Sequence, residues 1–206
     1  TDGIFLDDQA FWLRWNGRET QICSLDEFPL RGRHNYWNIA AAFALCRIHG
    51  VEPEEMVSAL REFRGLPHRL EELGVRRGLL WINDSIATTP ERAAAALRSF
   101  SDPLVVLAGG HDKNLSWEPF ASAAEVHAQQ IILFGEAAGT IMKALEQEGC
   151  RIPLRMTENL ESAVRTAADT AEENSVILLS PGCSSFDAYS DFEARGDHFR
   201  ELVETL

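Results

Sequence analysis

The sequence lacks any uninterrupted apolar run approaching the ~20 residues that a membrane helix needs. No segment resembling a signal peptide opens it either, because Thr1-Asp2-Gly3 leads directly into a predicted strand. With 45% hydrophobic and 25% charged residues, the 206-residue chain is expected to be globular and cytoplasmic.

Cysteine is sparse, and its spacing argues against cross-links. Three of the four cysteines lie in or beside apolar segments and none forms a C-x-x-C pair; they are Cys23, Cys46, Cys150 and Cys183. This pattern predicts reduced packing thiols rather than a disulfide or zinc framework. No histidine is placed beside Cys183, and the six histidines lack H-x-x-x-H spacing, so neither a thiol nucleophile nor a metal site is predicted.

Positive charge is scarce as well. The chain has 19 Lys and Arg against 32 Asp and Glu, which gives a net charge of −13 and an isoelectric point near 4.9. Such a field repels nucleic acids and anionic lipid surfaces, so neither is an expected partner. It also opposes an anionic metabolite. A site for one must therefore concentrate lysines, arginines and helix N-termini on particular loops.

The first 65 residues read as short strands followed by two helices. Asn16-Gly17 between two apolar runs predicts a β-hairpin. One helix is predicted over Asn35–His49, stopped by Gly50, and a second over Pro53–Phe63. In the first helix, one broad apolar face is expected to be buried, made of Ile39, Ala42, Phe43, Leu45 and Cys46.

From residue 66 the pattern changes to short apolar strands that alternate with helices. The predicted strands are Leu70–Val75, Leu79–Ile82, Leu104–Ala108, Ile131–Phe134, Ile152–Met156 and Val176–Leu179. The predicted helices are Pro90–Phe100, Trp117–His127, Ala137–Glu148, Leu160–Glu173 and Phe192–Leu206. This alternation is typical of a Rossmann-like α/β fold with a doubly wound, mostly parallel sheet. The predicted domains are therefore residues 1–65 and 66–206.

Four of these strands run into polar or glycine-rich turns. The turns are Asn83-Asp84-Ser85, Gly109-Gly110-His111-Asp112-Lys113, Phe134-Gly135-Glu136 and Ser180-Pro181-Gly182-Cys183-Ser184-Ser185. In sheets of this kind, ligands bind beyond the carboxyl ends of the strands. We therefore expect a binding site where these turns share one rim.

The turn after Asp84 carries a helix start with two alternative caps. Thr88-x-x-Glu91 fits a capping box, whereas Pro90 at the first helical position makes Thr89 the cap. Simple capping would explain the turn. The functional alternative is that the helix N-terminus and a threonine hydroxyl receive a carboxylate or phosphate, while Asp84 orients a ribose, a metal or a cation.

Lys113 follows Gly109-Gly110, where missing side chains let a ligand or another backbone approach. Alone it would read as a surface lysine. Because it shares the predicted rim with Thr88 and Ser185, a role in binding a carboxylate or phosphate is favoured.

His68-Arg69 lies at the junction between the two patterns, after Gly65-Leu66-Pro67. A hinge histidine and a surface arginine would be the plain interpretation, but an arginine fork between domains can also reach a triphosphate. Asn35, which follows His34, is explained by local capping or by a nucleotide contact. No G-x-x-x-x-G-K-[ST] phosphate loop occurs, so a nucleotide site using these residues needs that loop from elsewhere.

Six short motifs in order resemble the C-terminal half of the Mur ligase family. They are Gly32-Arg33-His34-Asn35-Tyr36-Trp37-Asn38, Gly65-Leu66-Pro67-His68-Arg69, Asn83-Asp84-Ser85 with Ala87-Thr88, Gly109-Gly110 with Lys113, Leu178-Leu179-Ser180-Pro181 with Ser184-Ser185-Phe186-Asp187, and Phe192-Glu193 with Arg195-Gly196-Asp197 and Phe199. Each motif is weak alone, whereas their conjunction from about Gly32 onward is specific.

The resemblance implies a cytoplasmic enzyme of peptidoglycan precursor synthesis that uses ATP and Mg²⁺. Members closest in motif add D-glutamate to UDP-N-acetylmuramoyl-L-alanine through an acyl phosphate. Residues 1–65 would be the tail of the central ATP-binding domain, and residues 66–206 the glutamate-binding domain. Carried over by motif, the ATP-binding residues are Asn35, His68, Arg69 and Asp84. The glutamate-binding residues are Thr88, Lys113, Ser185 and Phe192. Arg69 and Lys113 are the predicted catalytic residues, acting mainly by positioning.

Two departures from the family pattern qualify this expectation. Ile86 stands where many members carry a lysine, so Lys113 must neutralise more charge. The family's UDP-binding domain, phosphate loop and metal-binding region would all precede Thr1, so the chain is expected to be an inactive, monomeric fragment that supplies no metal ligand. Two alternatives stay open: another Mur ligase, such as one that adds L-glutamate, and a non-catalytic α/β binding module.

Overall fold

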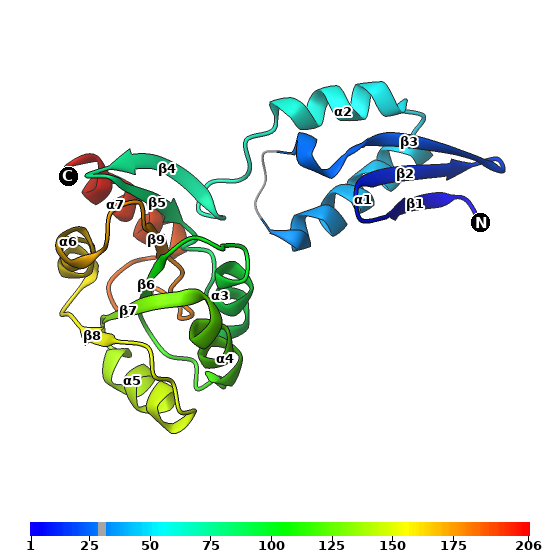
Figure 1. Cartoon of the computed structure of the whole chain (residues 1–206). Coiled ribbons are helices and arrows are strands. Elements are labelled where there is room, and N and C mark those ends of the chain that lie inside the picture. Colours follow the sequence, from blue (N-terminus) through cyan, green and yellow to red (C-terminus); the bar gives the residue numbers. More distant parts are fainter. Residues whose placement is uncertain (29–31) are drawn as a thin grey trace. The chain divides into compact units, whose positions relative to one another are not determined.

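The structure, a computed structural model, describes residues 1–28 and 32–206. The side chains of Asp26, Arg33 and His34 also lie outside the described part. The chain forms two compact units, Thr1–Gly65 and Leu66–Leu206 (Figure 1). No helix in the described part is long and apolar enough to cross a membrane.

The first unit begins with an antiparallel sheet of three strands. These are β1 (Gly3–Leu6), β2 (Ala10–Trp15) and β3 (Arg18–Ser24), in the order β1-β2-β3. Asn16 and Gly17 connect β2 to β3 with φ angles of 50° and 75°. Both values lie in the left-handed region that a two-residue hairpin turn of this kind requires, so the predicted hairpin is confirmed.

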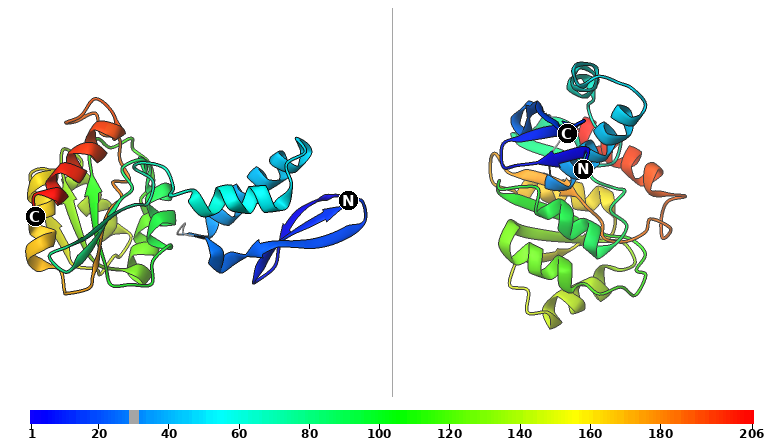
Figure 2. Two further views of the ribbon diagram at one scale, coloured as in Figure 1. Left: turned by 90° about the horizontal axis from the view of Figure 1, so that it is seen from above. Right: turned by 90° about the vertical axis from the view of Figure 1, so that its right-hand side faces the viewer.

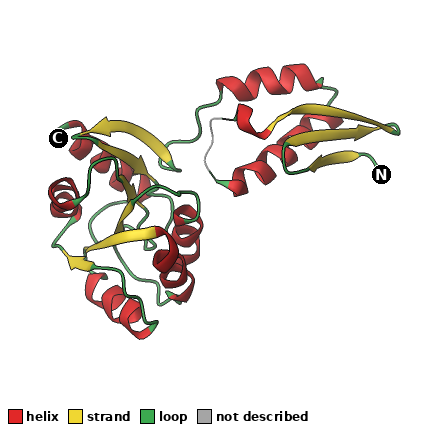
Figure 3. Ribbon diagram, viewed as in Figure 1, coloured by secondary structure: helices red, strands yellow, loops and turns green. Residues whose placement is uncertain are grey.

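A short 3-10 turn, η1 (Leu25–Glu27), and two helices complete this unit (Figure 3). The helices are α1 (Arg33–Ile48) and α2 (Pro53–Glu62), close to the predicted ranges. Their shared core with the sheet contains Phe11, Cys23, Ile39, Ala40, Phe43, Met56 and Val57.

One part of the expected core of α1 is wrong. Ile39 and Phe43 are buried, but Ala42 and Leu45 are exposed, and Leu45 retains 62% of its surface. Each helical residue advances by about 100°, so Leu45, two residues beyond Phe43, points to the opposite side of α1. The sequence alone did not distinguish the two sides because both are apolar.

The second unit contains a sheet of six strands in the order β4-β5-β9-β6-β7-β8. The strands are β4 (Glu71–Arg76), β5 (Leu79–Asn83), β6 (Leu104–Gly109), β7 (Ala128–Phe134), β8 (Leu154–Met156) and β9 (Val176–Leu179). Only β4 pairs antiparallel, with β5; every other pairing is parallel. The predicted doubly wound, mostly parallel α/β sheet is confirmed.

Helices cover both faces of this sheet, and Figure 2 shows α7 and α6 on the side away from α3. The helices are α3 (Pro90–Leu97), α4 (Glu118–His127), α5 (Ala138–Gln147), α6 (Leu160–Thr170) and α7 (Phe192–Glu204). In β6, Leu104, Val106 and Ala108 join the core under α3, α4 and α5, whereas Val105 and Leu107 join the core under α6 and α7. Alternate side chains of a strand point to opposite faces, which explains why all of β6 is apolar.

The strand order decides which loops become neighbours. The last strand in sequence, β9, lies between β5 and β6. The loop after β9 therefore lies between the loops after β5 and β6, although about 70 to 100 residues of chain separate them.

Helix α7 approaches this end of the sheet closely because it carries a glycine. His68 is buried against Gly196, and a Cβ atom at position 196 would lie 2.2 Å from His68 Nδ1. By contrast, a Cβ atom at Gly139 in α5 would meet only the flexible Met156 Cε, at 4.0 Å.

We predict that Gly196→Ala lowers the free energy of unfolding by about 1–3 kcal/mol, because the added methyl overpacks the contact with His68. The matched variant Gly139→Ala should leave stability unchanged or slightly raised, since alanine favours helix. Urea unfolding of both variants measures the difference. Equal stabilities would contradict the close contact.

Candidate functional site

The loops at the carboxyl ends of four parallel strands form one continuous rim. These rim loops are residues 84–89 after β5, 110–117 after β6, 135–137 after β7 and 180–191 after β9. The amide of Gly182 donates to the Ala87 carbonyl at 2.9 Å. The amide of His111 donates to the Ser184 carbonyl, also at 2.9 Å. The expected gathering of these turns on a shared rim is confirmed.

The glycines that open the loop after β6 allow close approach of other backbones. A Cβ atom at Gly109 would lie 1.9 Å from the Phe134 carbonyl oxygen, and one at Gly110 would lie 2.2 Å from the Ser184 carbonyl oxygen. Of the two sequence interpretations, approach of a ligand or of another backbone, the second explains these glycines.

Arg195 of α7 joins three of the strand ends from inside the protein. Its side chain is fully buried. Nε donates to Ser85 Oγ at 3.0 Å, and Nη2 donates to the Ser85 carbonyl at 2.9 Å. Nη1 donates to the carbonyls of Ser184 at 3.1 Å and Cys183 at 3.2 Å, with a longer contact of 3.5 Å to Gly109. One guanidinium group therefore fixes the loops after β5, β9 and β6 relative to one another.

Burial lowers the pKa of Arg195 to about 10, while the carboxylate of Asp187 opposes this shift. The group still carries its charge at neutral pH. Its hydrogen-bond acceptors are uncharged carbonyls and a hydroxyl, so its role is geometric. A single arginine in a helix does not reveal what it contacts, so the sequence indicates Arg195 only as part of a motif.

Asp84 lies at the start of the rim and is 4% exposed. Its Oδ2 accepts from Ser180 Oγ at 2.9 Å, and its Oδ1 accepts from the Leu70 amide at 3.2 Å. Burial raises the pKa of Asp84 to about 7, although these hydrogen bonds and the nearby Arg69 and Arg92 favour the ionised form. Asp84 therefore holds the segment that carries Arg69 against the loop after β9.

Arg69 itself is exposed and belongs to a backbone segment held by tertiary contacts. His68 and Leu70 on either side of it have φ angles of 62° and 46°, which are unusual for residues with side chains. The Ile86 amide donates to the His68 carbonyl at 3.1 Å. Among the described residues, the guanidinium groups of Arg69 and Arg92 have no hydrogen-bonded or ionic partner, and only their backbone amides donate, to the Leu66 carbonyl and to Thr89 Oγ1. Both guanidinium groups are thus open to an anion near Asp84.

The structure gives His68 an anchoring contact rather than an open position. Its Nδ1 lies 3.0 Å from Asn83 Nδ2, and its ring packs edge-on against Phe192. Asn83 also donates to the Gly196 carbonyl at 3.2 Å. Asn83 is fully buried and links β5 to α7, a role that the sequence motif around it does not reveal.

The four residues that are predicted to bind glutamate lie on segments that the rim contacts bring together. Thr88 is half-buried, Lys113 is exposed and Ser185 is buried. The carbonyl of Phe192 accepts from Ser85 Oγ at 2.8 Å, which ties the start of α7 to the loop after β5. Lys113 follows the bridge between His111 and Ser184 by two residues.

The two alternatives for the cap of α3 are resolved. Thr89 is the N-cap, and its Oγ1 accepts from the Arg92 amide at 3.5 Å. Pro90 occupies the first helical turn, as its fixed φ favours. The hydroxyl of Thr88 is consequently not used for capping.

Asn35 lies in the first unit, inside the first turn of α1. Its Oδ1 accepts from Asn38 Nδ2 at 3.2 Å. The cap position of this helix is Gly32, so Asn35 does not cap it. The adjacent His34 side chain falls outside the described residues.

The structure also describes the state of the cysteine thiols and the arrangement of possible metal ligands. All four cysteines are free thiols, as predicted, and burial raises the pKa of Cys183 to about 12, which keeps it protonated. Within the described ranges, no group of three or more His, Cys, Asp or Glu side chains is arranged to hold a metal ion.

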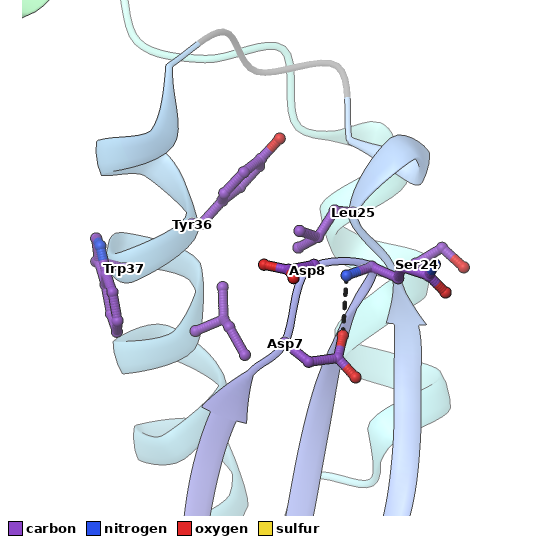
Figure 4. A pocket seen from close by; sticks show the side chains of 8 residues that line it. Asp7, Asp8, Ser24, Leu25, Tyr36 and Trp37 are labelled. Carbon is purple, nitrogen blue, oxygen red and sulfur yellow. Dashed lines mark hydrogen bonds between the residues drawn. The ribbon is translucent and has the colours of Figure 1, made fainter.

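A separate depression of about 860 Å³ lies in the first unit (Figure 4). It is lined by Leu6, Asp7, Asp8, Gln9, Ser24, Leu25, Tyr36 and Trp37. The Asp7 carboxylate accepts from the backbone amides of Gln9 and Ala10 at 2.9 and 2.8 Å, so it shapes the turn between β1 and β2. Hydrogen bonds to these amides lower the pKa of Asp7.

We predict that Asp84→Asn changes how stability depends on pH. Because the native pKa of about 7 exceeds the ordinary 3.8, the wild type loses stability as pH rises from about 4 to 7. The asparagine variant lacks this loss, which amounts to on the order of 4 kcal/mol across that window. Chemical unfolding at pH 4, 5.5 and 7 measures the effect. Parallel pH profiles for the two proteins would show that Asp84 titrates normally.

Arg195→Met should lower the free energy of unfolding by about 3 kcal/mol, because buried carbonyls of three loops lose their donor. Arg165→Met on α6 is the matched control, since that side chain is 73% exposed and should change stability by less than about 0.5 kcal/mol. Urea unfolding compares them. If both variants lose equally little free energy of unfolding, the arrangement of the loops does not depend on Arg195.

Comparison with known proteins agrees with this architecture. Residues 68–183, more than half of the chain, match the family model described as "Mur ligase, glutamate ligase domain". The match spans β5, β6, β7 and β9 and most of the rim loops.

Curated relatives match over the whole chain. UDP-N-acetylmuramoylalanine–D-glutamate ligase of Symbiobacterium thermophilum is 40% identical over 206 residues, which are 100% of this chain and 45% of that protein. The ligase of the same name from Pelotomaculum thermopropionicum is 35% identical over 205 residues, again 45% of its length. The chain thus spans a little under half the length of these relatives.

Solved structures share the fold. UDP-N-acetylmuramate-alanine ligase MurC from Thermotoga maritima gives a TM-score of 0.67 at 20% identity. The match covers 96% of this chain and 44% of the MurC chain. A pseudomurein peptide ligase type C from Methanothermus fervidus gives 0.68 at 17% identity, over 97% of this chain and 40% of its own. Together with the family model, these similarities show that the chain belongs to the Mur ligase family.

Proposed function

We propose that this chain is the C-terminal part of an ATP-dependent ligase that adds D-glutamate to UDP-N-acetylmuramoyl-L-alanine. The relatives that match the whole chain carry the name of that ligase. The reaction belongs to peptidoglycan precursor synthesis. That the protein is cytoplasmic and monomeric stays a prediction.

One observation carries the proposal: a buried guanidinium and short backbone contacts gather the loops that hold Thr88, Lys113, Ser185 and Phe192. Glutamate is a dicarboxylate and needs donors at both ends. Lys113, an exposed cation, together with the uncommitted Thr88 hydroxyl, suits one carboxylate. Ser185 and the backbone near Phe192 suit the other.

These residues would act by positioning the amine of glutamate rather than by acid-base chemistry. In the proposed reaction ATP transfers its terminal phosphoryl group to the carboxylate of the precursor, which releases ADP. The glutamate amine then attacks the acyl carbon, and the tetrahedral intermediate loses phosphate and a proton to leave the amide. Holding the amine in line with that carbon accounts for a large part of such a rate enhancement.

The ATP-binding residues are assigned as Arg69, Asp84, His68 and Asn35. Arg69 fits best, because its exposed guanidinium has no partner in the described structure and can pair with a phosphate. Asp84 keeps spare acceptor capacity beyond its two hydrogen bonds and suits a ribose hydroxyl. His68 would act by holding this segment in place.

Arg92 joins this set on the basis of the structure. It is exposed in the first turn of α3, and like Arg69 its charge lowers the pKa of Asp84. Since Ile86 supplies no charge where many family members have lysine, Arg92 is a second cation available for the phosphates.

Catalysis by this chain alone is not part of the proposal. The sequence has no phosphate-loop motif, and no metal-binding cluster occurs among the described side chains. We propose that the phosphate loop and the Mg²⁺ ligands come from additional polypeptide. ADP release by this chain that depends on precursor, ATP and glutamate would contradict that view.

D-glutamate should perturb backbone amide resonances of the rim loops, and Lys113→Ala should weaken this binding by about tenfold, the loss of one charge-assisted contact. Lys143→Ala is the matched control, because Lys143, the other lysine of the chain, is exposed on α5. NMR titration measures both variants.

The comparison of D- and L-glutamate separates the competing functions. Stronger perturbation by the L isomer would replace the proposed acceptor. If D-glutamate shifts the rim resonances of the wild type and of Lys113→Ala with equal affinity, Lys113 does not bind it and the assigned site is excluded.

A further inference from the structure

The rim loops around Lys113 carry more negative than positive charge. The loops after β6, β7 and β9 contain one lysine, Lys113, and the carboxyl groups of Asp112, Glu136, Asp187 and Asp191. Arg195 is buried, and its donors point at backbone carbonyls. A dicarboxylate that approaches Lys113 therefore meets opposing charge unless another group offsets it.

His111 is the only histidine of these three loops. Its Nδ1 lies 3.0 Å from Glu136 Oε2, and the two side chains are 49% and 64% exposed. The hydrogen bond to Glu136 and the charge of that carboxylate raise the pKa of His111 above its ordinary value, and Asp187 and Asp112 add to this. His111 thus faces carboxylates from the loops after β6, β7 and β9.

The loops do not need the pair of His111 and Glu136 to stay together. The amide and the hydroxyl of Ser184 both donate to the His111 carbonyl, at 3.2 and 3.0 Å. The Glu136 amide donates to Asp187 Oδ2 at 3.3 Å, which links the loops after β7 and β9. An exposed ion pair adds little to stability. The main effect of the pair is therefore on the charge near Lys113.

The position of His111 lets its charge act on the predicted glutamate site. Lys113 follows His111 by two residues, and Ser185 follows Ser184 directly. The backbone bridge between His111 and Ser184 brings these two stretches together. Charges this close at a protein surface are only partly screened by water and salt, so a positive charge on His111 favours a bound anion.

We propose that His111 is a further specificity-determining residue of the glutamate site, which favours the anionic acceptor when its imidazole is protonated and paired with Glu136. The inference rests on the proposed function in taking D-glutamate as the ligand of Lys113. With His111 protonated, the charge of Glu136 is offset. With His111 neutral, Glu136 opposes the dicarboxylate. Binding of glutamate is then linked to uptake of a proton from solvent by His111.

A pH profile of D-glutamate binding tests this role. The affinity of the chain should fall by about threefold from about pH 6 to about pH 8.5 at low ionic strength, because one positive charge beside the site is lost. The carboxyl groups of glutamate stay ionised throughout this range. His111→Gln keeps a hydrogen-bonding group but no charge, so its affinity should equal the high-pH value of the wild type at every pH. NMR titration of the rim amides measures these affinities.

Two comparisons attribute the profile to His111. His127→Gln is the matched control, because His127 lies at the amino end of β7, where its Nδ1 is 3.2 Å from the Phe100 carbonyl. This variant should keep the wild-type profile. Asp84, with a pKa of about 7, titrates in the same range. A pH dependence that persists in His111→Gln would therefore overturn the proposal.

Glu136→Gln separates the electrostatic role from a structural one. Without this carboxylate, the affinity near pH 8.5 should rise about threefold above that of the wild type, and the pKa of His111 should fall in the free protein. Because linkage is reciprocal, saturation with D-glutamate should raise the pKa of His111 in the wild type, as its imidazole resonances report. Weaker binding by Glu136→Gln at every pH would show a merely structural pair and overturn the proposal.

Failure of the proposed function gives a different pattern. Binding that is independent of Lys113 at every pH would overturn both the proposed function and the role of His111. Binding that depends on Lys113 but has a flat pH profile in the wild type would overturn the role of His111 alone.

Discussion

The guanidinium of Arg195 is the point on which the candidate site depends. Three loops that leave the sheet at different points of the sequence have no reason of their own to stay aligned. Each offers backbone carbonyls, and one buried planar cation satisfies several of them at once. Since an unsatisfied buried carbonyl costs roughly 1–3 kcal/mol, the loops and the helix that supplies Arg195 stabilise one another. The close packing of Gly196 against His68 extends this arrangement to the segment that carries Arg69.

Charge is distributed unevenly around this rim. The chain as a whole is strongly acidic, yet Arg69, Arg92 and Lys113 stand exposed near the strand ends. Among the described side chains, Asp84 is the one buried carboxyl beside them, and burial raises its pKa to about 7, so that it is only partly ionised at neutral pH. These three side chains offer positive charge to an anion, although the rim loops also carry the carboxyl groups of Asp112, Glu136, Asp187 and Asp191. A dicarboxylate or a phosphate would therefore have to bind through these particular cations rather than through a uniformly positive rim.

The two units differ in how completely they are packed. The sheet of the second unit is covered on both faces, and its central strand β6 is buried at every residue. The first unit has a small core, and α1 leaves tryptophan, leucine and isoleucine side chains in solvent. Such a surface is consistent with a unit that shares its core with further polypeptide.

Much of the fold follows from the sequence itself. Periodicity, Asn-Gly at the hairpin and Pro53 at the start of a helix are local signals, so the strands, helices and α/β class could be predicted. The candidate residues could also be named, because the motifs are short and contiguous. Tertiary structure alone decided which threonine caps α3, which side of α1 is buried and what Arg195 contacts. These depend on which elements become neighbours, and the position of β9 between β5 and β6 brings together residues about 100 positions apart. Local sequence determines the elements, whereas the buried partners of Asp84, His68 and Arg195 exist only once the sheet is assembled.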